Sequence, residues 1–93
     1  MKIMAMCSTG LGSSFMLRLN IADVLKEMGL TDVQVEHSDL SSADPSSADA
    51  FFVAKDLEDA ARGLGDVTVM DSLIDKDELR AKVEAVAERH HLL

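Results

Sequence analysis

The chain has 93 residues, of which 47% are hydrophobic, and a formal net charge of −8. This size and composition fit one globular domain with one core, which we assign to residues 1–93. Nucleic acid is disfavoured as a partner, because its phosphates demand patches of Lys and Arg. No apolar run approaches the roughly 20 residues of a membrane span, so we expect no direct membrane insertion.

The first elements are a strand and a helix. A short apolar run at Lys2–Met6 predicts a buried strand. A helix is predicted from Ser13 or Ser14, as its N-cap, to about Met28, with Gly29 in the position that favours a left-handed terminating turn. The expected buried face of this helix follows the helical period and comprises Leu17, Ile21, Val24, Leu25 and Met28.

The remainder of the chain continues to alternate between strands and helices. Val33–His37 alternates polar and apolar residues as an edge strand does, and Ala48–Ala54 is apolar throughout, as in a central strand. Asp56–Gly63 is long enough for two helical turns, and Asp66–Met70 is predicted as a fourth strand. The last helix is expected from Asp75 to about Arg89, with Leu79, Val83, Val86 and Ala87 facing inward.

Strands separated by helices indicate parallel pairing with right-handed crossovers. We therefore expect an α/β fold, with a four-stranded parallel sheet in the order 2-1-3-4 flanked by helices, as in flavodoxin-like and low-molecular-weight phosphatase-like proteins. In that order the first and third strands are central. A topological switch point, where ligands of such folds bind, lies at the end of the first strand, directly before Cys7.

The segment after this strand reads Cys-Ser-Thr-Gly-Leu-Gly-Ser-Ser and has the features of a phosphate loop. Two glycines let the backbone curl so that several N–H groups converge, the hydroxyls add donors, and the following helix N-terminus favours an anion. These donors would stabilise a thiolate and then hold a phosphoryl group bonded to its sulfur. We predict Cys7 as the catalytic nucleophile and the phosphate-binding residues Ser8, Thr9, Gly10, Leu11, Gly12, Ser13 and Ser14.

The alternative is a structural cysteine, since a lone cysteine at a strand end is often inert core. Inert core needs no glycine-serine cradle directly after it, so we favour the nucleophile. A single cysteine also forms no internal disulfide and fits a reducing compartment, which is why we expect a cytoplasmic protein. The charge distribution is consistent with a phosphate site. Residues 1–30 carry a net charge of +1 and residues 31–93 a net charge of −9, so the loop lies in the segment that repels an anion least.

Other phosphate loops differ at particular residues. A Walker loop needs Lys after its last glycine, where Ser13 stands, and a dinucleotide-binding loop needs a third glycine at the position of Phe15. Low-molecular-weight tyrosine phosphatases carry Cys-x5-Arg-Ser, and Ser13 replaces that arginine. Without the arginine we expect weak hydrolysis, so the loop is predicted to carry phosphate and pass it on.

The chain resembles the IIB components of the bacterial phosphoenolpyruvate-dependent sugar phosphotransferase system. Within the lactose-, ascorbate- and galactitol-like IIB proteins it is most similar to the ascorbate type. These proteins open with a strand, then Cys-Gly-x-Gly-x-Gly-Ser-Ser and an apolar helix, and the matching residues are Cys7, Gly10, Gly12, Ser13 and Ser14. Ser8 replaces the first glycine, and the resemblance is specific over about residues 3–29.

The resemblance implies a transferase of the kinase type. Cys7 would take a phosphoryl group from a histidine of a IIA partner, become phosphocysteine, and donate the group to a sugar bound by the membrane-embedded IIC partner. The sugar would be ascorbate, a related sugar acid or a pentitol. No metal and no cofactor is implied.

Two other functional classes remain as hypotheses. A low-molecular-weight cysteine phosphatase or an arsenate reductase is disfavoured by the missing arginine and by the single cysteine, which leaves no resolving thiol. A binding module without covalent chemistry, such as a flavin domain, is disfavoured by the shortage of aromatic residues.

Several residues beyond the loop have open or secondary roles. Phe15 and Met16 either fill the core or dock a partner protein. Lys55 is expected to be solvated, and His90 and His91 to form a solvated end of the last helix.

Overall fold

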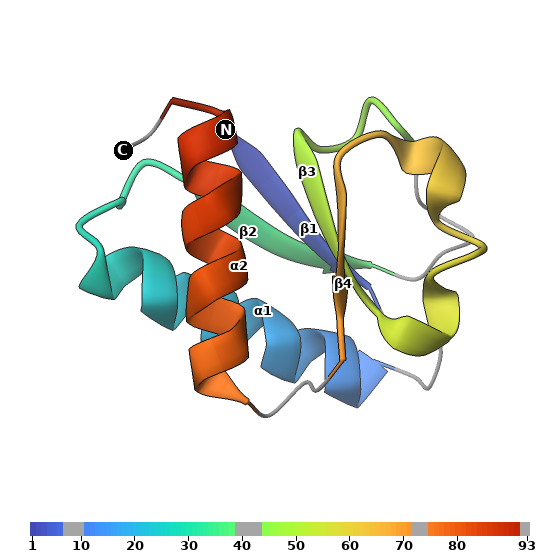
Figure 1. Cartoon of the computed structure of the whole chain (residues 1–93), viewed down its shortest axis with the longest axis horizontal. Helices are drawn as coiled ribbons and strands as arrows, with labels where there is room; N and C mark the ends of the chain where they lie inside the picture. The colour runs from blue at the N-terminus through green and yellow to red at the C-terminus, as the bar shows by residue number, and fades with distance from the viewer. Residues whose placement is uncertain (7–10, 39–43, 72–74, 92–93) are drawn as a thin grey trace.

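The computed structural model describes residues 1–6, 11–38, 44–71 and 75–91, apart from the side chains of residues 11–14 and 56. The elements follow one another as β1 (Lys2–Met6), α1 (Leu11–Glu27), β2 (Gln34–Ser38), β3 (Ala50–Ala54), η2 (Lys55–Leu57), η3 (Arg62–Leu64), β4 (Val67–Met70) and α2 (Lys76–Arg89) (Figure 1). The two η segments are short 3₁₀ turns.

The four strands form one sheet in the order β2-β1-β3-β4, and every neighbouring pair is parallel. This confirms the predicted α/β, flavodoxin-like fold and its strand order. Met6, the last residue of β1, pairs with Ser38 of β2 and with Val53 of β3. The central strands therefore finish close to the same level at one edge of the sheet.

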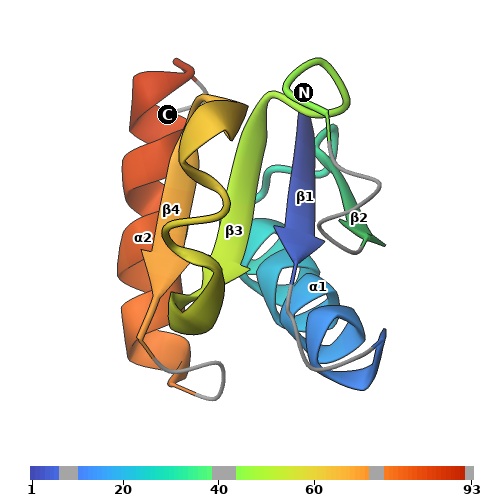
Figure 2. The same cartoon turned by 90° about the vertical axis from the view of Figure 1, so that its right-hand side faces the viewer.

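Both faces of the sheet are covered, so the fold has three layers. The two helices pack on one face and the segment containing η2 and η3 lies on the other, as Figure 2 shows. Alternate residues of β1 point to the two sides: Ile3 and Ala5 belong to the core under the helices, and Met4 and Met6 to the core under the 3₁₀ turns. Burial on both faces explains why Ile3–Met6 of β1 and all of β3 are apolar.

Helix α1 has the predicted buried face and the predicted C-terminal turn. Four of the five expected residues are buried, and Met28 is half-buried. Gly29 has a φ of 80°, its N–H donates to the Lys26 carbonyl, and the Leu30 N–H donates to the Leu25 carbonyl, at 3.1 and 2.8 Å. This pair of hydrogen bonds is a Schellman motif, which satisfies carbonyls that the helix end leaves unpaired.

The predicted start of α1 is wrong. The helix begins at Leu11, so Ser13 and Ser14 lie inside its first turn and neither is the N-cap. The N–H groups of a first turn have no intrahelical partner, and that turn therefore accepts Gly and Ser readily. Residue type alone does not locate the cap in such a sequence.

The predicted helical turns over Asp56–Gly63 are also wrong, because the segment forms only the two 3₁₀ turns η2 and η3. Leu57 and Ala61 are its buried side chains, too few to supply the apolar face of an α-helix. Gly65, with a φ of 106°, then turns the chain into β4. Helix α2 follows the prediction, with Leu79, Val83, Val86 and Ala87 buried.

Candidate functional site

The candidate site lies at the edge of the sheet where the four parallel strands end, seen at the arrowheads in Figure 2. Residues 7–10 join the end of β1 to the start of α1. The predicted nucleophile Cys7 and the predicted phosphate-binding residues Ser8, Thr9 and Gly10 lie outside the described residues. The backbone of the other four predicted residues, Leu11, Gly12, Ser13 and Ser14, forms the first turn of α1.

The position of this connection in the sheet is fixed by its two ends. Met6, to which Cys7 is bonded, is fully buried and lies between β2 and β3. The chain leaves β1 through α1 on one face of the sheet, and leaves β3 through η2 and η3 on the other. Adjacent strands whose connections depart to opposite faces define the switch point at which α/β folds bind ligands.

The two helices begin at this same edge with different side chains. The first turn of α1 contains no acidic residue. Before α2, the carboxylate of Asp75 accepts hydrogen bonds from the N–H groups of Asp77 and Glu78, at 3.0 and 3.1 Å, and those two residues add further negative charge. The N-terminal N–H groups of α2 therefore bind a carboxylate of the chain itself, whereas the first turn of α1 has no acidic residue.

Phe15 and Met16, which the sequence left open between core and surface, are exposed. The exposed fractions are 42% for Phe15, 54% for Met16 and 41% for Leu19. Prediction from the sequence missed Leu19, although its i, i+4 spacing from Phe15 indicates a second apolar face on α1.

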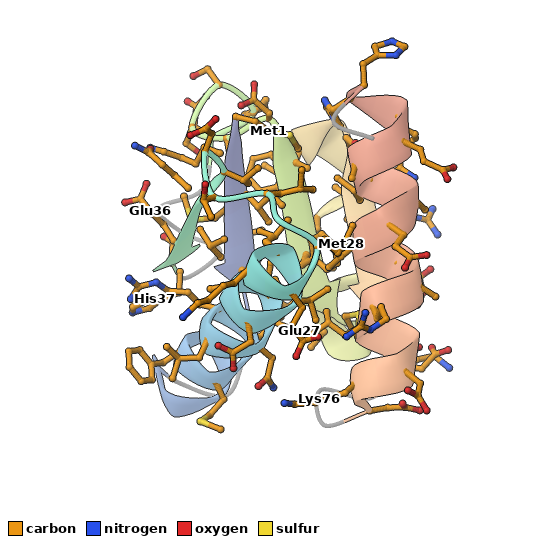
Figure 3. All side chains as sticks on the ribbon, turned by 90° about the vertical axis from the view of Figure 1, so that its left-hand side faces the viewer. Met1, Glu27, Met28, Glu36, His37 and Lys76 are labelled. Atoms are coloured by element: carbon orange, nitrogen blue, oxygen red, sulfur yellow. The ribbon has the colours of Figure 1, made fainter. Side chains whose placement is uncertain are left out.

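Two neighbours hold the Phe15 ring in place. His37, at the end of β2 beside the first turns of α1 (Figure 3), meets the ring edge to face, with 5.6 Å between centroids and 88° between planes. The Arg18 guanidinium lies over the same ring, 5.9 Å from its centre, and its Nε donates to the Val35 carbonyl at 3.0 Å. No hydrogen-bond partner for the buried Nδ1 of His37 occurs in the part of the chain that the structure describes.

His90 is not the solvated residue that the sequence predicted. It is half-buried, and its Nε2 lies 2.8 Å from a carboxylate oxygen of Asp66, whose other oxygen contacts Arg89 at 2.7 Å. Burial raises the pKa of Asp66, but the hydrogen bonds from His90 and Arg89 outweigh it and hold that pKa below its usual value. The cluster ties the end of α2 to the start of β4. His91 and Lys55 are exposed, as expected.

The described residues contain no group of three or more His, Cys, Asp or Glu side chains arranged to bind a metal ion. Among those same residues, no helix has the length and apolar character needed to cross a membrane.

The chain matches the model of a known protein family. Residues 2–85 match the family model described as "PTS system, Lactose/Cellobiose specific IIB subunit", from the first strand into the last helix. No curated protein sequence matches the chain. The family match favours a phosphotransferase-system component over a cysteine phosphatase, and it does not distinguish the ascorbate type from its relatives.

Proposed function

Because the chain belongs to the lactose/cellobiose-specific IIB family of the sugar phosphotransferase system, a phosphoryl-transfer component of sugar uptake, we propose that Cys7 carries the phosphoryl group. The observation that most supports this is the place of the Cys7–Ser14 segment. It connects the buried central strand β1 to a helix whose first turn contains no carboxylate. An anion bonded to Cys7 would meet the positive end of the α1 dipole there.

The proposed transfer has two steps. In the first, the Cys7 thiolate attacks the phosphorus of a phosphohistidine on the IIA partner. The S–P bond forms, the P–N bond breaks, and the departing electron pair stays on the imidazole nitrogen, which takes up a proton. In the second, a hydroxyl oxygen of the sugar attacks the same phosphorus, the S–P bond breaks, the thiolate is regenerated and the hydroxyl proton is released.

The residues after Cys7 are proposed to position the phosphoryl group. The backbone N–H groups of residues 8–13 and the hydroxyls of Ser13 and Ser14 would donate to its three oxygens. Charge stabilisation and positioning supply most of the catalysis in phosphoryl transfer. Ser13 stands where cysteine phosphatases have arginine, which favours a group that is passed on rather than hydrolysed.

The sugar and the partners follow from the resemblance to ascorbate-type IIB proteins. We propose that the donor is a IIA protein, that the acceptor is ascorbate, a related sugar acid or a pentitol bound to a IIC transporter, and that both transfers take place in the cytoplasm. IIC-containing vesicles supplied with ascorbate, pentitols, lactose or cellobiose would identify the acceptor by which sugar discharges the phosphorylated chain.

The test of Cys7 is a phosphorylation relay. With phosphoenolpyruvate, the general phosphotransfer proteins and the cognate IIA protein, the chain is expected to gain one acid-stable, thiol-linked phosphoryl group, and Cys7→Ser is expected to gain none. The urea unfolding midpoint of Cys7→Ser serves as the folding control. Phosphate on the same site of a folded Cys7→Ser variant would refute the proposal.

A further inference from the structure

Helix α1 carries an apolar surface outside the core, which we term the α1 patch: Phe15, Met16 and Leu19. These are the exposed large hydrophobic side chains of the described residues, and their spacing places them together on the outer side of the helix. The remaining large apolar residues of α1, from Leu17 to Leu25, are buried. Single exposed apolar residues need no explanation, but a contiguous group is typical of a protein-binding surface.

Two contacts position Phe15 within the patch. The Phe15 ring makes a T-shaped contact with the His37 ring and lies under the Arg18 guanidinium, and Arg18 is itself anchored to the backbone of β2. An aromatic side chain that is already ordered loses little conformational entropy when a partner covers it. Preorganised aromatic residues of this kind supply much of the binding energy of protein interfaces.

The patch lies near the Cys7 loop. Helix α1 begins at Leu11, and Phe15 is four residues further on, which is about 6 Å along the helix axis. A standard interface covers about 800 Å² on each partner, a patch about 30 Å across. A protein with an interface of this size that brings a phosphohistidine into contact with Cys7 would therefore extend over the first turns of α1 and reach Phe15.

Charge indicates which protein binds there. Residues 11–22 of α1 contain no acidic residue, and Arg18 is their only charged side chain, whereas residues 31–93 carry a net charge of −9. The patch thus lies on a stretch of α1 that offers a phosphoryl dianion the Arg18 cation and no carboxylate. The exposed Glu36 of β2, which interacts with Arg18, is paired with Lys2. A second copy of the chain would bring another body with a net charge of −8.

We propose that the α1 patch, with Phe15 as its anchor, is the docking surface for the phosphorylated IIA donor. This inference rests on the proposed function, because it requires that Cys7 accept phosphate from such a donor.

The test compares two patch variants with a matched control. Phe15→Ala removes the anchor, Leu19→Lys places a charge on the patch, and Ala85→Lys places the same charge on an exposed position of α2. The steady-state rate of phosphorylation is measured against phospho-IIA concentration. Each patch variant is expected to raise KM about tenfold or more, with kcat changed little, and Ala85→Lys to change KM less than about twofold.

The outcomes separate this inference from the proposed function. If the wild-type chain accepts no phosphate from IIA, the proposed function fails. If it does, and both patch variants keep the wild-type KM, only the docking surface is refuted. The docking surface is also refuted if these variants slow transfer to IIC alone, or change only self-association in sedimentation. Leu19→Lys alters an exposed side chain, so it keeps the test valid should Phe15→Ala unfold.

Discussion

Helices α1 and α2 begin at the same edge of one sheet and pack together on one of its faces, yet their N-termini differ in chemistry (Figure 1). An ion pair between Glu27 and Arg80 further joins the two helices (Figure 3 labels Glu27). At α2, Asp75 binds two backbone N–H groups and two more acidic residues follow. At α1, the first turn reads Leu-Gly-Ser-Ser, with no acidic residue.

This difference teaches that the fold alone does not select the anion site. Both helices direct a positive dipole end toward the carboxyl edge of the sheet. The acidic residues of α2 stabilise their own helix and would repel phosphate. The first turn of α1 has no acidic residue, so its dipole would favour an external anion such as the proposed phosphoryl group. Four predictions test this difference between the helices.

Giving α1 the chemistry of α2 should block phosphorylation. Ser13→Asp adds a carboxylate to the first turn of α1, where the phosphoryl group on Cys7 is proposed to bind. Two unit charges about 5 Å apart repel by about 3 kcal/mol at an effective dielectric constant near 20. The rate of phosphorylation by phospho-IIA should therefore fall about a hundredfold. Ala85→Asp adds the same charge on α2 and should leave the rate within about twofold. Equal rates for the two variants would contradict a phosphate site at α1.

Removing the cap of α2 should lower stability without affecting transfer. Asp75→Ala takes away the acceptor of two N–H groups, and such a change costs about 1 kcal/mol of unfolding free energy. Urea denaturation measures this loss, and the phosphorylation rate should stay within about twofold of wild type. Ser13→Ala is the counterpart: alanine has the higher helix propensity, so stability should hold while the rate falls. A stable Asp75→Ala variant with a strongly reduced rate would assign the phosphate site to α2.

Stability should also depend on the Asp66 contacts at the other end of α2. The pKa of Asp66 is lowered in the folded state, so its stabilising effect is present above the unfolded pKa and is lost as pH falls through the folded pKa. Asp66→Asn should cost about 1 kcal/mol near neutral pH, with the difference closing below about pH 4. Asp59→Asn is the control, because the Asp59–Arg62 pair is highly exposed and contributes little. A deficit of Asp66→Asn that persists unchanged in acid would argue against the contact.

The last comparison concerns the two helix C-termini and includes the smallest expected effect, that of His91→Gly. Helix α1 is followed by Gly29 at a φ of 80°, whereas α2 is followed by His91 at a φ of 61°, a conformation that costs energy for a residue with a side chain. His91→Gly should raise stability by about 0.5 kcal/mol, and Gly29→Ala should lower it by about 1 kcal/mol. Thermal unfolding detects both shifts. No atom of the described residues lies within 4 Å of a Cβ placed at Gly29, so a loss there reports the backbone conformation.

Much of the fold was predictable because its strands and helices bury continuous apolar faces. The runs of β1 and β3, the periodicity of Leu17–Leu25 and the left-handed Gly29 each specify local structure, and together they gave the correct strand order. The incorrect predictions concern segments in which the residue types fit more than one local structure. Serines suit both an N-cap and a first turn, which misplaced the start of α1. The Asp56–Gly63 segment has helical length but lacks a helical apolar face.

The candidate site was predictable in part. The Cys7–Ser14 motif identified the family that the match over residues 2–85 confirmed, while the roles of Cys7 and its neighbours stay predictions. The setting of Phe15 was not predictable, because the edge contact with His37 and the Arg18 bond to Val35 depend on how α1 packs against β2. The Asp66–His90 contact likewise joins residues 24 positions apart.

The central claim is that α1, and not α2, binds the phosphoryl group. The most direct measurement is the change in backbone amide NMR shifts when the chain is phosphorylated by IIA. If α1 binds the phosphoryl group, the largest shift changes are expected at the amides of residues 8–14 and almost none at Lys76, Asp77 and Glu78. Changes of equal size at the two helix N-termini, or larger ones at α2, would contradict it.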